Sequence, residues 1–132
     1  MHKNLIAPCG MNCGICLGYL RDKNKCLGCR EMSEGKPNQC RKCIIVHCKI
    51  LKENKMLFCS DECEKFPCIR LKNLDKRYKT KYKMNMLENL ENIKKFGIEK
   101  FIKLEQKRWK CPKCGELLCV HRDSCLNCSQ KR

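Results

Sequence analysis

Three closely spaced cysteines near the start of the chain could bind a metal. Cys9, Cys13 and Cys16, called here the N-terminal trio, have the spacing C-x3-C-x2-C in the stretch CGMNCGIC. Thiolates at this spacing can hold three corners of an iron–sulfur cluster or three of the four positions around a zinc ion. The fourth ligand must come from elsewhere: the candidates are His47, His2, a later cysteine, or a position left open for a substrate.

Two cysteine pairs near the end of the chain have the spacing of a small zinc ribbon. The pattern C-x2-C-x10-C-x2-C is formed by Cys111, Cys114, Cys125 and Cys128. Each pair can give two thiolates to one ion from a single tight turn, which favours tetrahedral zinc. We expect a hairpin over residues 116–122 between the pairs. Cys119 and His121 lie in this hairpin. One interpretation is that they are a buried thiol and a surface imidazole. The other is that they replace a ligand of the zinc ribbon or help to bind a second ion.

The remaining cysteines predict further sites. The same ten-residue separation recurs between two earlier pairs, formed by Cys26, Cys29, Cys40 and Cys43. Another four-thiolate site could use Cys48, Cys59, Cys63 and Cys68. Spacing alone leaves exchange of ligands between neighbouring sites open, His47 included. We therefore predict about three to four zinc ions per chain, with an iron–sulfur cluster at the N-terminal trio as the alternative.

Cysteine is so frequent that metals, rather than a large apolar core, are expected to stabilise the fold. The 132 residues include 16 Cys but only one Trp, three Tyr and four Phe, which leaves little for a core. No secretory signal is visible in MHKNLIAP, so we expect a cytoplasmic protein whose thiols stay reduced and available to metals. No apolar run approaches the roughly 20 residues of a membrane span, so we expect no membrane association.

The net charge is strongly basic, but metal binding would lower it. The formal value of +16 treats every thiol as neutral. A zinc ion with four thiolates carries −2, so four such sites would bring the charge to about +8. The excess of Lys and Arg is thus partly a balance to zinc–thiolate centres, and an anionic partner stays possible.

The elements that must position these cysteines are predicted to be mainly helices and irregular loops. Apolar residues recur every three positions from Leu87 to Phe96, and Gly97 suits a helix C-terminus. Helices are predicted over residues 16–23, 44–55, 61–73 (interrupted by Pro67), 85–96 and 98–109. The cysteines divide the chain into a multi-zinc module (1–70), a helical connector (71–110) and a zinc ribbon (111–132).

The segment Lys72–Lys83 is the most basic part of the chain. One interpretation is a solvated helix end and linker. The other is a phosphate-contacting basic strip, with Tyr78 and Tyr82 free to stack on bases. The residues of this basic strip are Lys72, Lys76, Arg77, Lys79, Lys81 and Lys83.

Taken together, the order of motifs resembles a family of cysteine-rich bacterial and archaeal domains of unknown function, family 3795. The resemblance covers nearly the whole chain and rests on five segments: Cys9–Tyr19, Cys26–Arg30, Cys40–Lys52, Cys63–Cys68 and Asn89–Cys128. It implies metal binding and a small cysteine-rich fold, and no established activity. The stretch CSDEC at 59–63 departs from the family's C-x-x-C by one residue, which leaves open whether Cys59 and Cys63 bind the same ion.

These patterns favour a non-enzymatic, zinc-stabilised module that binds a protein or a nucleic acid. An iron–sulfur electron-transfer protein and a zinc enzyme are the alternatives. The spacing of the N-terminal trio is also that of radical S-adenosylmethionine enzymes, but this chain lacks the length and the alternating strand and helix patterns of their barrel. No glutamate is convincingly placed as the general base of a zinc enzyme.

Overall fold

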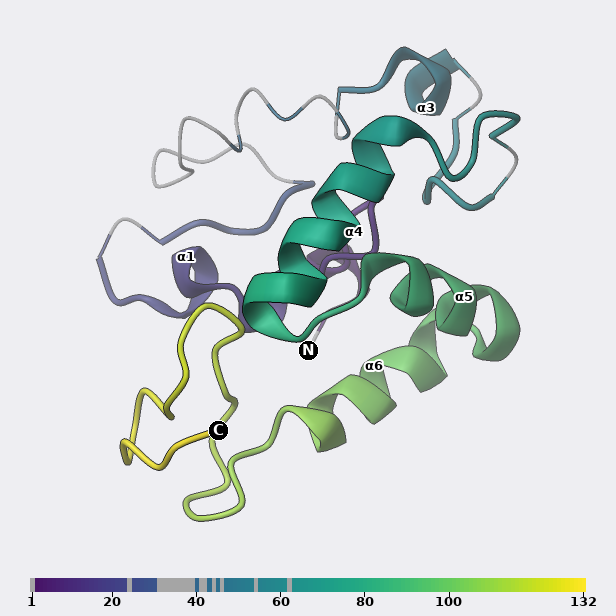
Figure 1. Cartoon of the computed structure of the whole chain (residues 1–132). Coiled ribbons are helices and arrows are strands. Elements are labelled where there is room, and N and C mark those ends of the chain that lie inside the picture. The colour runs from purple at the N-terminus through teal and green to yellow at the C-terminus, as the bar shows by residue number, and fades with distance from the viewer. Residues whose placement is uncertain are drawn as a thin grey trace.

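The structure is a computed structural model that describes residues 2–23, 25–30, 40, 43, 45, 47–53, 55–61 and 63–132. These residues form a small, mainly helical protein without a β-sheet (Figure 1), as the sequence predicts. The described 3-10 helices are η1 (Lys3–Leu5) and η2 (Cys13–Ile15). The described α-helices are α1 (Leu17–Leu20), α3 (Lys49–Glu53), α4 (Ile69–Tyr82), α5 (Met86–Phe96) and α6 (Ile98–Arg108).

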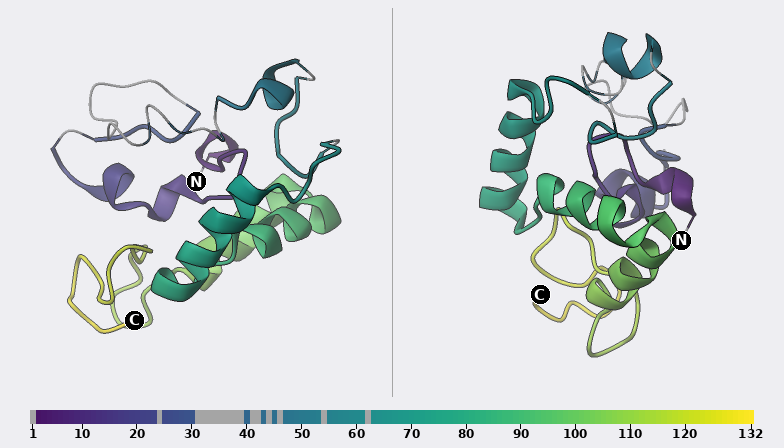
Figure 2. Two further views of the ribbon diagram at one scale, coloured as in Figure 1. Left: turned by 45° about the horizontal axis from the view of Figure 1, so that its top comes forward. Right: turned by 90° about the vertical axis from the view of Figure 1, so that its right-hand side faces the viewer.

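The last three helices pack against one another in chain order, α4 on α5 and α5 on α6 (Figure 2). The side chain of Asn85 starts α5 by accepting the backbone N–H of Glu88 at 2.9 Å, which satisfies one free donor of the first turn. Gly97, at φ 86°, ends α5 and leads directly into α6. The apolar face of α5 is buried through Met86, Leu90 and Ile93.

The N-terminal loop that carries Cys9 lies against α5. The side-chain amide of Asn89 donates to the backbone carbonyl of Gly10 at 3.0 Å, in a buried position. A Cβ atom at Gly10 would lie only 2.8 Å from the carbonyl oxygen of Met86, and its φ is +92°. Only glycine fits this close approach without strain. The cysteine-rich start of the chain is therefore fixed to the helical part by backbone contact.

The C-terminal segment packs beside α1 and the end of α4 (Figures 1 and 2). The backbone N–H of Val120 donates to the carbonyl of Ile15 at 2.8 Å. The guanidinium of Arg132 donates to the carbonyls of Cys119, Val120 and Tyr82 at 2.8 to 3.0 Å. The two cysteine-rich ends of the chain thus meet in the fold.

The predicted helices over 85–96 and 98–109 are confirmed as α5 and α6. The prediction over 61–73 is wrong in its first half, because the described residues from 59 to 68 form turns and α4 begins only at Ile69, after Pro67. Helix α4 then continues through most of Lys72–Lys83, which is therefore not a linker. It ends at Lys83, whose φ of 56° is left-handed.

Two short predicted helices are shorter still in the structure. The prediction over 16–23 is reduced to the single turn of α1. The prediction over 44–55 is met by α3 alone, and positions 44, 46 and 54 lie outside the described residues. In the part of the chain that is described, no helix has both the length and the apolar character needed to cross a bilayer.

Candidate metal centre

Four sulfur atoms converge at the end of the chain. The thiols of Cys111, Cys114, Cys125 and Cys128, called the C-terminal centre, all lie within 4.8 Å of one another. Across the two pairs, Cys111 Sγ lies 3.6 Å from Cys128 Sγ, and Cys114 Sγ lies 3.6 Å from Cys125 Sγ. The four residues predicted from spacing are therefore brought together.

The two turns that hold these sulfurs have the same backbone pattern. In the first, the N–H of Gly115 donates to the carbonyl of Cys111 at 2.9 Å, and the N–H of Cys111 donates to Glu116 at 2.8 Å. In the second, Ser129 donates to Cys125 at 3.0 Å, and Cys125 donates to Gln130 at 2.8 Å.

The residue after each pair is left-handed, at φ 81° for Gly115 and 65° for Ser129. This conformation closes the turn and aims both thiols of a pair at one point.

The centre could hold a tetrahedral metal ion. Zinc–sulfur bonds of about 2.3 Å in a tetrahedron place the sulfurs about 3.8 Å apart. The 3.6 Å separations across the pairs are close to that value. Four soft thiolates complete the coordination of a tetrahedral ion and leave no open position, which is typical of structural sites.

The thiols of the C-terminal centre ionise at different pH. The pKa of Cys114 is lowered to about 6, first by the neighbouring side-chain amide of Asn127 and then by the backbone N–H of Glu116. The pKa of Cys111 is lowered by the backbone N–H of Cys114. The backbone N–H of Gln130 lowers the pKa of Cys128, but desolvation and the neighbouring thiols raise it to about 11. Such a cluster loads a divalent metal by releasing protons.

The hairpin predicted over residues 116–122 is wrong. In this part of the chain the structure has isolated antiparallel bridges, between Lys110 and Leu117 and between Ser124 and Lys131, and no strands. In a hairpin, the backbone groups of these residues would pair with one another. Here they form hydrogen bonds to other parts of the chain: the N–H of Leu118 donates to the carbonyl of Trp109, and the N–H of Val120 donates to the carbonyl of Ile15.

Cys119 and His121 are not ligands of the C-terminal centre. Cys119 is fully buried, and burial raises the pKa of its thiol; it is the buried thiol that the sequence predicts. His121 is not the predicted surface residue, because it is half-buried with both ring nitrogens in contact. Nδ1 accepts the N–H of Leu17 at 3.3 Å, and Nε2 lies 2.9 Å from the Tyr78 hydroxyl. No sequence signal pointed to this packing role.

The N-terminal trio is positioned by the loop before η2 and by η2 itself. Cys9 and Cys13 are buried, and Cys16 is half-buried. The backbone N–H of Cys29 donates to Cys13 Sγ at 3.4 Å, so the turn that holds Cys29 lies against the trio. Burial raises the pKa of both Cys9 and Cys16, and among the neighbouring thiols Cys29 raises it most. Cys29, predicted as part of the set with Cys26, Cys40 and Cys43, thus has its backbone at the trio, and the fourth ligand of the trio stays a prediction.

The two histidine candidates for the fourth ligand are both exposed, and neither is tested as a ligand. His47 is exposed. His2 is exposed, and its Nδ1 accepts the backbone N–H of Asn4 at 3.1 Å, so it caps η1.

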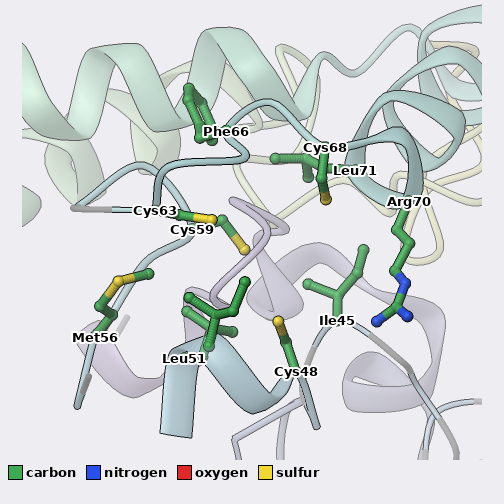
Figure 3. A pocket seen from close by; sticks show the side chains of 11 residues that line it. Ile45, Cys48, Leu51, Met56, Cys59, Cys63, Phe66, Cys68, Arg70 and Leu71 are labelled. Carbon is green, nitrogen blue, oxygen red and sulfur yellow. The ribbon is translucent and has the colours of Figure 1, made fainter. Parts of the chain in front are cut away.

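The other predicted ligands stay predictions. Cys26 is buried, and its N–H donates to the carbonyl of Gly18 at 2.8 Å, while Cys40 and Cys43 are half-buried. Outside the C-terminal centre, no three described side chains offer ligand atoms within 4.8 Å of one another. The residues of the other predicted four-thiolate site all line one pocket (Figure 3): Cys48, Cys59, Cys63 and Cys68.

The basic strip lies on α4 and at its end, and all six of its side chains are exposed. Its two tyrosines are not free to stack on bases. The ring centroids of Tyr78 and Tyr82 lie 4.9 Å apart, and those of Tyr82 and His121 also lie 4.9 Å apart. Both tyrosines pack against the C-terminal segment, so any nucleic-acid contact by the strip would be made by its charges.

Comparison with known proteins adds no relative: the chain matches no protein-family model, no curated protein and no solved structure.

Proposed function

We propose that the protein is a zinc-stabilised, non-enzymatic module that presents its helices to a protein or nucleic-acid partner. The observation that carries the proposal is the meeting of four cysteine sulfurs within 4.8 Å in two matching turns. The preferred ligands and geometry of zinc agree with this donor set. Membership of the cysteine-rich family 3795, drawn from the order of motifs, is part of the same proposal.

A structural role is favoured over catalysis by the ligands themselves. Catalytic zinc keeps one position for water or substrate, whereas the C-terminal centre supplies four thiolates. The residues between its two turns bond directly to the start of the chain through Val120 and His121. Zinc in this centre would therefore fix the surface that joins the two ends of the chain.

The basic strip favours an acidic partner. Its six exposed cations follow one helix, and the described part of the chain gives them no salt bridge to a carboxylate. A surface of this kind attracts phosphates or acidic side chains through long-range electrostatics.

An iron–sulfur electron-transfer role is the second candidate. It is favoured by the N–H of Cys29 donating to Cys13 Sγ, because hydrogen bonds to ligating sulfur tune the potential of such clusters. The burial of Cys9 and Cys13 would also keep a cluster from solvent.

Anaerobic purification, elemental analysis and an absorption spectrum test the proposal. We expect zinc, no broad band at about 400 nm, and the loss of one zinc equivalent in Cys114→Ser. The control is Cys119→Ala, which should keep all the zinc. Iron with the broad band would replace the all-zinc account by the second candidate. Full zinc retention in Cys114→Ser would refute zinc at the C-terminal centre.

A further inference from the structure

Four cysteines far from the C-terminal centre surround one cavity. Cys48 precedes α3, Cys59 and Cys63 lie in the turns that follow it, and Cys68 is the N-cap residue of α4. All four line the same pocket, and Figure 3 shows their side chains around it. We call this group the four-cysteine pocket.

The rest of the lining is almost entirely apolar. Ile45, Leu51 and Leu71 are buried at 6%, 5% and 0% exposure and form the walls. Among the described residues of the lining, Arg70 is the one with a charged side chain, and it is exposed. The cavity volume is about 30 Å³, above the roughly 10–15 Å³ that one water molecule needs on this measure. A single ion fits this space.

The thiols of the pocket are close enough to affect one another. Burial, followed by the neighbouring thiols of Cys68, Cys48 and Cys63, raises the pKa of Cys59 to about 12. Arg30 acts in the opposite direction. Four cysteine side chains around one apolar pocket supply the donor set that a tetrahedral divalent cation takes as thiolates.

We propose that Cys48, Cys59, Cys63 and Cys68 together bind one tetrahedral zinc ion, which joins the start of α3 to the start of α4. Each thiol gives its proton to solvent as its sulfur binds the ion, so no redox change is involved. This site is separate from the C-terminal centre and does not depend on the function proposed above. It assigns Cys59 and Cys63 to the same ion.

The sulfurs must move closer for this ion to bind, because no three of them lie within 4.8 Å of one another and zinc requires about 3.8 Å. The chain allows this movement. The described residues from 59 to 68 form turns without a helix or strand, so side-chain rotation and a small backbone shift do not break regular structure. Cys59 is tied to the N-terminal loop through its N–H, which donates to Pro8 at 2.9 Å. Closure would therefore draw Cys63 and Cys68 towards a fixed Cys59.

Native mass spectrometry of the reduced, zinc-loaded full chain tests the proposal. We expect Cys63→Ser and Cys59→Ser each to lose one zinc equivalent relative to wild type. The control Cys119→Ala should lose none, because Cys119 is buried away from this pocket. The double variant Cys63→Ser/Cys114→Ser should lose two, which distinguishes this site from the C-terminal centre. Wild-type zinc content in both Cys63→Ser and Cys59→Ser would overturn the proposal.

Alkylation of the wild-type protein gives a second test that needs no variant. With zinc bound, the four pocket cysteines should react slowly with iodoacetamide, and a chelator should raise all four rates together. Equal rates with and without the chelator would overturn the proposal. Iron found with these four cysteines protected would also overturn it, since the pocket would then hold a cluster and not a single zinc ion.

Discussion

The hydroxyl of Tyr78 lies 2.9 Å from Nε2 of His121, and this contact joins α4 to the C-terminal segment. Nδ1 of the same ring accepts the backbone N–H of Leu17. A neutral imidazole has one acceptor and one donor, so Nε2 carries the hydrogen and donates it to the Tyr78 oxygen. One histidine thus links α4, the residue after the N-terminal trio, and the segment between the two turns of the C-terminal centre.

Tyr78→Phe should lower the free energy of unfolding by about 1 kcal/mol, because the Nε2–H of His121 would lose its acceptor in a half-buried position. Chemical denaturation with excess zinc measures this change. The matched control is Tyr19→Phe, since the face of the Tyr19 ring contacts the Lys25 ammonium at 4.5 Å and phenylalanine keeps that contact. Equal losses in the two variants would contradict the role assigned to Tyr78.

His121 should make the protein less stable at mildly acidic pH. Burial, followed by the charges of Arg122 and Arg132, holds the pKa of His121 below its ordinary 6.5. The imidazole of His121 therefore binds a proton more readily in the unfolded chain than in the folded protein. The contribution of the neutral imidazole to stability is present above about pH 6.5, and it is lost as the pH falls through the pKa that His121 has in the folded protein. Titration of the imidazole by NMR checks the direction; a pKa above 6.5 in the folded protein would contradict it.

Gly115→Ala should destabilise the first turn of the C-terminal centre by about 1 kcal/mol, because alanine is strained at positive φ. A Cβ there would meet only Lys110 Cε at 3.5 Å, an ordinary contact, so the cost is conformational. Ser129→Ala is the matched control, since residue 129 already has a Cβ at φ 65°. Thermal unfolding with zinc bound should show a clear loss for Gly115→Ala and little for Ser129→Ala.

The stability of the Glu105→Gln variant relative to the wild type should increase as the pH rises. Glu105 is 3% exposed, and its Oε2 has no hydrogen-bond partner, like two other buried atoms, Asn12 Nδ2 and Trp109 Nε1. Burial raises the pKa of Glu105 from 4.5, although the charge of Arg108 acts against this.

The native state therefore favours the protonated acid. The contribution of the Glu105 carboxyl group to stability is complete below about pH 4.5, and it is lost as the pH rises through the pKa that Glu105 has in the folded protein. Unfolding of the wild type and the variant in excess zinc should show a stability difference that moves in favour of glutamine between pH 4.5 and 7. Loss of zinc at low pH affects both proteins and cancels in the difference. A difference that does not vary with pH would contradict the raised pKa.

Reversing charge on the basic strip should weaken binding to an anionic partner. With DNA or RNA at low salt as the probe, Lys76→Glu/Lys79→Glu should lose roughly tenfold or more in affinity and reduce the salt dependence, because phosphate contacts release counterions. The control is Lys103→Glu/Lys107→Glu, which makes the same change at exposed positions of α6. No detectable wild-type binding at low salt, or equal loss in the control, would rule out the strip as a nucleic-acid surface.

Local sequence determined the parts of this protein whose geometry is set within a few residues. The C-terminal centre could be predicted because two residues between cysteines, followed by a left-handed position, already aim two sulfurs at one point. Helices α5 and α6 could be predicted because apolar periodicity and the glycine between them are also local.

Tertiary structure alone decided the rest. The ring of His121 became a packing group because its partners, Leu17 and Tyr78, lie 104 and 43 residues away in the sequence. The spacing of the cysteines does not predict that Cys29 lies at the N-terminal trio. It also does not predict that α4 extends through the basic strip. Ligands from distant segments meet only where the packing of the intervening chain brings them together. Ordering that chain costs conformational entropy, which is offset by tertiary contacts that no short motif contains.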